Sequence, residues 1–229
     1  GNQNMQIMIP KVTIAVKALL FVSVAVFLGQ LAGEHWFGLP LTYVLGFVPK
    51  LLLHGWVWQP FTYAFLHAGV FHLVFNLLIL WSIGSELEQQ WGPKFFLLYF
   101  FGCTVGAAIT YCLFAAMGIG GAMEIPVVGC SGAVYGMLLA YGILFGDRVL
   151  YFFMIFPMRA KYFVMILGAI VLISTVFYSD NGVAHTAHLG GMIAGLAILL
   201  SAVVWKRRMR MEASGELSAK KRQKRVEKA

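Results

Sequence analysis

The charged residues of this chain are separated by long apolar stretches. Aspartate, glutamate, lysine and arginine are absent from residues 55–85, 95–123, 125–146, 162–179 and 181–205. A helix rises about 1.5 Å per residue, so each stretch is long enough to cross, or nearly cross, a hydrocarbon core about 30 Å thick. A sixth apolar stretch covers residues 11–32 and has Lys17 near one end, where its side chain can extend to the headgroups. The pattern predicts an all-α, polytopic membrane protein with six transmembrane helices.

The boundaries of the six spans follow from the same pattern. The spans are expected at about residues 12–31, 70–86, 95–117, 129–146, 162–177 and 183–205. Residues 33–69 are apolar but irregular, with three prolines and three tryptophans. Because proline interrupts helices and tryptophan concentrates at membrane interfaces, this stretch is expected to form a loop in the interface. Residues 147–161 are expected to form a charged connection between spans four and five.

Composition supports a membrane protein and limits the partners. Hydrophobic residues make up 60% of the chain and charged residues 11%, and the mean hydropathy is +0.82, well outside the range of soluble domains. The net charge is +8, but ten of the 17 Lys and Arg residues lie from Lys206 onward. A basic run directly after a membrane helix is typical of a cytoplasmic tail on anionic lipid. We therefore expect membrane lipids, and no nucleic acid, as partners of this tail.

The positions of the cations also predict the orientation. If the N-terminus is cytoplasmic, six spans return the tail to the cytoplasm and leave only Lys50 in an outer loop, in agreement with the excess of positive charge found inside. The chain then divides into a short cytoplasmic N-terminus (residues 1–10), a six-helix membrane domain (11–205) and a basic cytoplasmic tail (206–229). We expect an integral multi-pass protein of a bacterial inner membrane.

Three polar residues are expected at a similar depth in spans two, four and six. Asn76 lies about six residues past Val70, Ser131 about five past Pro126 and His188 about five past Val183. With the N-terminus inside, all three spans begin at the outer face, so at helical rise these residues lie about 7 to 9 Å below it. Polar side chains at this depth face a cavity or one another. The pattern therefore predicts one buried polar site near the outer face.

These residues include the components of nucleophilic catalysis. A serine hydroxyl becomes a nucleophile when a base takes its proton and donors hold the developing oxyanion. His188 can be the base for Ser131, and because spans four and six contain no Asp or Glu the pair would act as a dyad. Tyr135 lies one helical turn after Ser131 and can stack on the imidazole. Gly132 and Gly191 each begin a pair of glycines spaced by four, which lets two backbones approach closely.

The same residues also fit less specific roles. A serine in a membrane helix often bonds back to a carbonyl or packs as a small residue. His72, His185 and His188 could form a zinc or proton site, but the chain has no H-E-x-x-H motif and no carboxylate at that depth. We therefore expect no metal and no cofactor, and interpret His185 as structural or interfacial. The Cys130 thiol is a rival nucleophile, although adjacent helical residues diverge by about 100° and only one can face His188.

Five motifs follow one another in order between about residues 50 and 200. They are Trp58-Gln59-x-x-Thr62, His67, His72-x-x-x-Asn76, Gly129-x-Ser131-Gly132 and Ala187-His188-x-x-Gly191-x-x-x-Gly195. In order and spacing this set resembles the rhomboid intramembrane serine proteases. The chain departs from that family at Cys130, where alanine is common, and at Gln59, where some members carry arginine.

The resemblance implies a six-helix rhomboid-like bundle with Ser131 and His188 as the catalytic dyad. The other site residues that it implies are the oxyanion donors His72 and Asn76, together with the Ser131 amide, and the supporting residues Tyr135, Gly129 and Gly132. The substrates implied are single-pass membrane proteins, cut in or next to their spanning helix. They would reach the site laterally, past the fifth span and the short cap at Ser179–Gly182.

Two alternative functions stay open at this point. The first is a catalytically inactive relative that binds membrane clients, although such relatives typically lack the serine or the histidine. The second is a small polytopic transporter, whose function would depend on a transported ion and on His72 and His185 rather than on Ser131.

Overall fold

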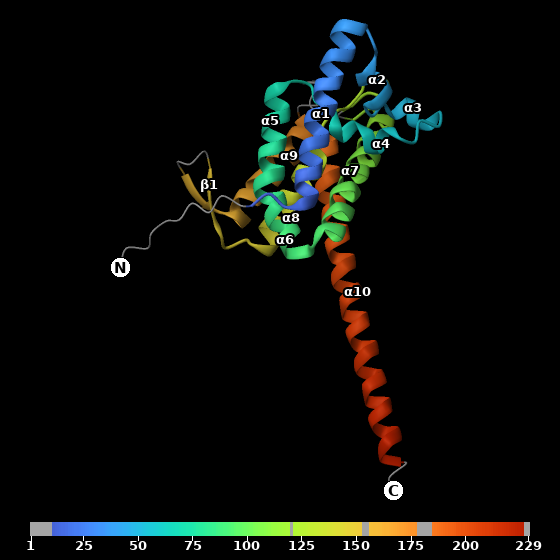
Figure 1. The fold of residues 1–229 in the computed structure, drawn as a ribbon, viewed down its shortest axis with the longest axis vertical. Helices are drawn as coiled ribbons and strands as arrows, with labels where there is room; N and C mark the ends of the chain where they lie inside the picture. The colour runs from blue at the N-terminus through green and yellow to red at the C-terminus, as the bar shows by residue number, and fades with distance from the viewer. Residues whose placement is uncertain (1–10, 120, 153–155, 178–184, 227–229) are drawn as a thin grey trace.

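The computed structural model describes residues 11–119, 121–152, 156–177 and 185–226. These residues form a bundle of helices, from which the last helix extends far beyond the others (Figure 1). The expected N-terminal segment (residues 1–10) and the expected cap at Ser179–Gly182 lie outside the described residues.

Six apolar helical segments occupy the positions expected for the six spans. They are α1 (Ile14–Phe37), α5 (Val70–Ile79) with its continuation through η2 (Leu80–Gly84) and α6 (Ser85–Trp91), α7 (Pro93–Ala116), α8 (Ser131–Leu144), α9 (Ala160–Phe177) and α10 (His185–Val226). Among the described residues, four are long and apolar enough to cross a membrane: 14–37, 70–91, 93–116 and 185–214. The helices at 131–144 and 160–170 are apolar but shorter. The prediction of a polytopic helical protein is confirmed, while the count of six spans stays a prediction.

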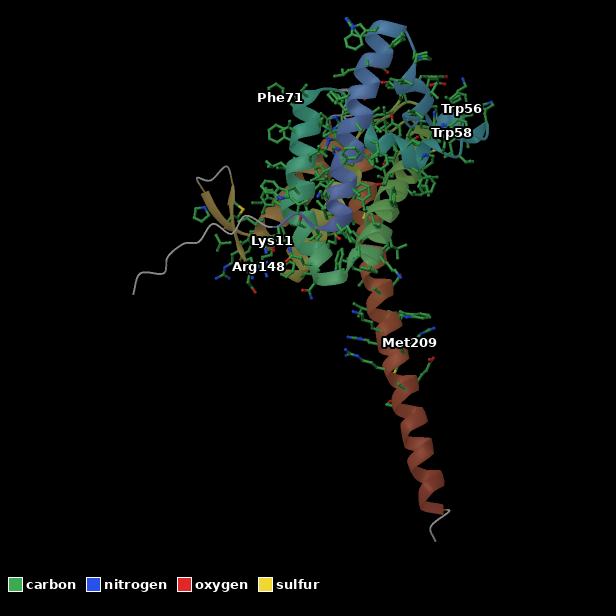
Figure 2. The ribbon with its side chains drawn as sticks, viewed as in Figure 1. Lys11, Trp56, Trp58, Phe71, Arg148 and Met209 are labelled. Atoms are coloured by element: carbon green, nitrogen blue, oxygen red, sulfur yellow. The ribbon has the colours of Figure 1, made fainter. Side chains whose placement is uncertain are left out.

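The stretch between α1 and α5 folds into four short helices instead of one span. They are α2 (Leu41–Leu45), α3 (Pro49–Leu53), α4 (Gln59–Thr62) and the 3-10 turn η1 (Tyr63–Phe65). The fully buried Gln59 ties them together: its Oε1 accepts from the Val48 N–H at 3.0 Å and its Nε2 donates to the Tyr43 carbonyl at 2.9 Å. Trp56 and Trp58 stack on each other at the rim of this segment (Figure 2). Its irregular but ordered fold agrees with the expected loop, and its position in the membrane interface stays a prediction.

The charged connection between α8 and α9 contains a β-hairpin that the sequence analysis does not predict. Strands β1 (Val149–Phe152) and β2 (Phe156–Arg159) pair antiparallel, with Val149 opposite Arg159. Residues 149–158 carry no charge, so the alternation of apolar and polar residues that normally indicates a strand is missing.

Glycines bring α8 and α10 into direct backbone contact. A Cβ atom added to Gly191 would overlap the backbone of Gly132, and one added to Gly136 would lie 3.0 Å from the Gly191 carbonyl oxygen. Helix α7 also contacts α8 here, where the Tyr99 hydroxyl donates a hydrogen bond to the Gly136 carbonyl at 2.7 Å. The prediction that the spaced glycines allow α8 and α10 to approach closely is confirmed.

The buried carboxylate of Glu88 stabilises the start of α1. Glu88 in α6 is 3% exposed and accepts hydrogen bonds from the Thr13 hydroxyl and from the backbone N–H groups of Ala15 and Val16, at 3.0 and 2.9 Å. These N–H groups belong to the first turn of α1, which has no side-chain cap of its own and whose N–H groups lack partners within the helix. Glu88 therefore caps α1 from a different helix.

We expect Glu88→Gln to lower the free energy of unfolding by about 1 to 3 kcal/mol, because a charge-assisted cap at a helix N-terminus is lost in a buried place. Thermal unfolding in detergent measures the effect. The matched control is Glu86→Gln on the same helix, since Glu86 pairs with Arg148 at a more exposed position and such pairs contribute about 0 to 1 kcal/mol. Equal melting temperatures for the two variants would contradict the capping role.

Candidate active site

Ser131 and His188 meet where α8 and α10 begin. The Ser131 Oγ lies 2.8 Å from the His188 Nε2, which is a hydrogen-bonding distance. Ser131 is the first residue of α8, and His188 lies in the first turn of α10. The close approach at Gly132 and Gly191 brings the two helix starts near enough for a short serine side chain to reach the imidazole. The structure therefore brings together the two residues expected to form a dyad.

The expectation that Ser131 lies about five residues inside a helix is wrong. The residues before it are not helical: Val127 forms an antiparallel bridge with Phe47, and Gly129 has φ +108°, which only glycine adopts readily. An extended chain advances about 3.3 Å per residue, against 1.5 Å in a helix, so Ser131 is still carried well into the bundle.

The imidazole of His188 is oriented by Tyr135. The two rings are stacked, with centroids 4.3 Å apart and an interplanar angle of 13°. Among the described residues, the buried His188 Nδ1 has no hydrogen-bond partner. No described carboxylate therefore occupies the third position of a triad, and the ring is held by stacking on one side and by the Ser131 hydroxyl.

His72 and Asn76 of α5 line the same cavity as Ser131 and His188. The His72 Nδ1 accepts a hydrogen bond from the Ala68 N–H at 3.4 Å, so the ring proton is on Nε2. A Cβ atom added to Gly129 would lie 2.9 Å from that Nε2. The His72 imidazole therefore packs against Gly129, two residues before Ser131 in the chain. Asn76 uses one amide hydrogen on the His72 carbonyl at 2.9 Å and keeps a second one.

The backbone N–H group of Ser131 is a further hydrogen-bond donor at the site. The first N–H groups of a helix have no partner within the helix and lie at the positive end of its dipole. Because α8 begins at Ser131, the N–H groups of Ser131 and Gly132 are in this position. This feature depends on the helix starting at Ser131, which the sequence analysis did not anticipate.

A cavity of about 870 Å³ contains these groups. Its polar lining residues lie at the N-terminal ends of α8 and α10, on α5 and, with Tyr111, on α7. Part of its apolar lining comes from the stretch 125–128 before α8, and another part comes from α5, α8 and α9 through Phe75, Ile79, Leu138, Phe163 and Leu167. The cavity thus joins a small polar centre to an apolar passage between α5, α8 and α9.

Cys130 points away from this centre. Its side chain is 1% exposed, and its Sγ lies 3.9 Å from the Nε2 of His67, outside the Ser131–His188 pair. The geometry therefore agrees with the expectation that only one of the two adjacent residues can face His188. Cys130, Cys103 and Cys112 are all free.

Two tyrosines near the site were not identified from the sequence. The Tyr63 hydroxyl donates to the Thr104 carbonyl at 2.7 Å, while the Tyr63 carbonyl accepts from the Gly129 N–H at 2.8 Å and fixes the glycine beside the site. Tyr111 lines the cavity, and its hydroxyl accepts from the Ala122 N–H at 3.2 Å. Neither residue belongs to a recognisable motif, and the Tyr63 contacts link segments distant in sequence.

His185 lies beside His188, with ring centroids 6.1 Å apart. Within the described part of the chain, no group of three His, Cys, Asp or Glu side chains could hold a metal ion. The histidines therefore do not form a three-ligand metal site there.

Comparisons with known proteins identify relatives of this chain. The rhomboid domain model matches residues 54–205. The chain is 29% identical to Rhomboid protease GluP of Bacillus subtilis over 64% of its length and 26% of the relative's length. It is 31% identical to the mitochondrial Rhomboid protein 1 of Saccharomyces cerevisiae over 66% of its length and 44% of that protein. A shorter match, 37% identical over 25% of the chain and 16% of the relative, is to Inactive rhomboid-related protein 2 of Caenorhabditis elegans.

The chain spans less than half the length of these relatives. The domain match nevertheless covers most of the chain, from α3's end to the last apolar turn of α10. With its apolar helices, the chain is an integral membrane protein whose helical bundle is rhomboid-like, and it belongs to the rhomboid family.

Proposed function

We propose that this chain is an intramembrane serine endopeptidase that cuts single-pass membrane proteins in or next to their transmembrane helix. The observation that carries the proposal is the 2.8 Å contact between the Ser131 Oγ and the His188 Nε2, made at the start of α8 inside a cavity. The family of the chain supports the same reaction class.

The proposed reaction uses only the side chains and backbone of the site. His188 takes the proton of the Ser131 hydroxyl, and the Oγ attacks the carbonyl carbon of the scissile peptide. The imidazolium then gives this proton to the leaving amine, which releases the first product and leaves an acyl-serine. A water molecule, deprotonated by His188, hydrolyses the acyl-serine and restores the hydroxyl.

Neutral donors would hold the charge that develops on the carbonyl oxygen. No lysine or arginine is among the described residues that line the cavity, so the candidates are the Ser131 N–H, the His72 Nε2–H and the second amide hydrogen of Asn76. The positive end of the α8 dipole lies at the same place and favours an anion there.

The apolar wall of the cavity indicates how a membrane helix would arrive. Helix α9 is buried mainly at its start, where Val164 packs against Gly142 of α8, and its later described residues are half-buried or exposed. Phe163 and Leu167 of the same helix line the cavity. These contacts support lateral access past α9, the fifth expected span.

The orientation and domain organisation are part of the proposal. We place residues 1–10 and the basic tail 206–229 in the cytoplasm, the membrane domain at 11–205, and the active site near the outer face of a bacterial inner membrane. Figure 1 shows α3, the helix that contains Lys50, near one end of the bundle and the C-terminal extension of α10, which contains the basic run, departing from the other. This distribution supports the orientation.

The direct test is to incubate the detergent-purified chain with a model single-pass membrane protein. Cleavage near the spanning helix by the wild type, and none by Ser131→Ala, is the expected result. The inactive alternative predicts no cleavage by either protein, although the chain keeps both dyad residues. The transporter alternative predicts ion dependence and no effect of Ser131→Ala.

We expect Asn76→Ala to lower kcat by about 10²- to 10³-fold with little change in KM, because a positioned oxyanion donor acts mainly in the transition state. The matched control is Ser82→Ala in the same span. The Ser82 hydroxyl donates to the Leu78 carbonyl four residues earlier, just as the Asn76 amide donates to the His72 carbonyl. Ser82 is not among the described residues that line the cavity. A serine-reactive fluorophosphonate should still label Ser131. Activity lost only in proportion to the melting temperature would assign Asn76 a structural role.

A further inference from the structure

The β1–β2 hairpin is an apolar element on the outside of the bundle. Residues 149–158 carry no charge, yet Val149 is 50% exposed and Pro157 is also exposed. Among the described residues, the hairpin is fixed at its base, where Leu150 packs against the core and the Lys161 N–H donates to the Gly146 carbonyl at 3.0 Å. Figure 1 shows the hairpin standing off the side of the bundle, beside the end at which α6 ends and α9 begins.

Neither water nor hydrocarbon suits such an element. In water, two isolated strands are marginally stable and exposed apolar edges promote aggregation. In the hydrocarbon core, the open edges of a two-stranded sheet would leave backbone N–H and C=O groups without partners, which does not occur in lipid-exposed segments. The headgroup layer satisfies both requirements, because apolar side chains can reach the acyl chains while the edges bond to water and headgroups.

The base of the hairpin carries an excess of cations. Arg159 and Lys161 share a single carboxylate, Asp147, at 3.6 and 2.7 Å. The hydrogen bond from Lys161 holds the pKa of Asp147 below its usual value, so Asp147 is charged but can neutralise only one of the two cations. The Arg159 and Lys161 side chains remain 56% and 40% exposed.

Further cations lie at the same end of the molecule. Arg148 pairs with Glu86 and packs over the Phe145 ring at 4.1 Å. Figure 2 shows Lys11 and Arg148 at the same end of the bundle, from which the basic extension of α10 departs. The cations therefore lie where the apolar helices end, at the expected level of the phosphates.

We propose that the β1–β2 hairpin lies in the headgroup layer of the membrane and that Arg159 and Lys161 bind the phosphates of anionic phospholipid there. The occupant is identified by charge complementarity at the membrane boundary. This lipid-binding surface is separate from the Ser131–His188 site and does not depend on the proposed proteolytic activity.

The first experiment measures the depth of the hairpin in the full chain, reconstituted in vesicles of phosphatidylcholine and phosphatidylglycerol. A nitroxide on Val149→Cys, in a Cys112→Ala background, is compared with one on Met211→Cys, an exposed position of α10 in the basic run that begins at Lys206. We expect the Val149 label to collide mainly with lipid-soluble oxygen and the Met211 label mainly with a water-soluble nickel chelate. Equal nickel access at both sites, or spin–spin broadening at Val149 from a second copy of the chain, would overturn the proposal.

The second experiment measures lipid selectivity. Native mass spectrometry counts the phosphatidylglycerol retained by the wild type, by Arg159→Gln/Lys161→Gln and by Lys50→Gln. Lys50 is the matched control, since its side chain is also 56% exposed and paired with one carboxylate, at the other end of the molecule. We expect each cation removed from the hairpin base to lower the preference for phosphatidylglycerol about fivefold, with no change for Lys50→Gln. An unchanged preference in the double variant, or an equal loss in Lys50→Gln, would contradict the proposal.

Discussion

Replacing Ser131 with alanine should abolish peptide cleavage and leave the fold unchanged. The substitution removes one hydroxyl, whose oxygen lies 2.8 Å from the His188 Nε2, and alanine keeps the start of α8 intact. Loss of the nucleophile in a serine protease lowers kcat by far more than loss of a single donor, and we expect a decrease of at least about 10⁴-fold. Cleavage of a model membrane substrate measures the effect, and the melting temperature in detergent shows that the fold is kept.

The matched control for this prediction is Cys130→Ala. A thiol is intrinsically a better nucleophile than a hydroxyl, and Cys130 is the neighbour of Ser131 in sequence. However, its Sγ is buried beside His67 and does not contact His188 in the described structure. Cys130→Ala should therefore keep most of the activity. An inactive Cys130→Ala together with an active Ser131→Ala would assign the reaction to the thiol.

Replacing His188 with alanine should be as damaging as replacing Ser131. The imidazole is the only described base at hydrogen-bonding distance from the Ser131 hydroxyl, and without it the hydroxyl keeps its proton. Because the two residues act as a unit, the double variant Ser131→Ala/His188→Ala should lose no more activity than either single variant. Single-turnover cleavage assays on the three variants measure this non-additivity.

His185→Ala is the control for the base. His185 lies one turn before His188, with ring centroids 6.1 Å apart, and it is the His188 ring that lies at hydrogen-bonding distance from the Ser131 Oγ. We expect this variant to keep substantial activity, and the wild type to stay active in strong chelators. Inhibition by a chelator that added zinc reverses would instead indicate a metal site.

The sequence by itself determined the class of the protein and the identity of the candidate residues. A run of about 20 uncharged residues is enough to predict a membrane helix, since the cost of burying a charge in lipid depends little on tertiary contacts. For the same reason the six apolar segments are found where they are expected. Ser131, His188 and Asn76 were identified because polar side chains are conspicuous in such segments.

The tertiary structure decided how these residues are presented. The start of α8 at Ser131, and with it the free backbone N–H groups of the site, depends on the pairing of Val127 with Phe47, which is 80 positions earlier in the chain. Tyr63, which fixes Gly129, also acts across a long separation. The β1–β2 hairpin left no periodic signal because residues 149–158 are uniformly apolar or aromatic, with no alternation of polar residues. Periodicity reports only the environment of one segment, whereas helix starts, backbone donors and hairpins depend on which distant segment becomes the hydrogen-bond partner.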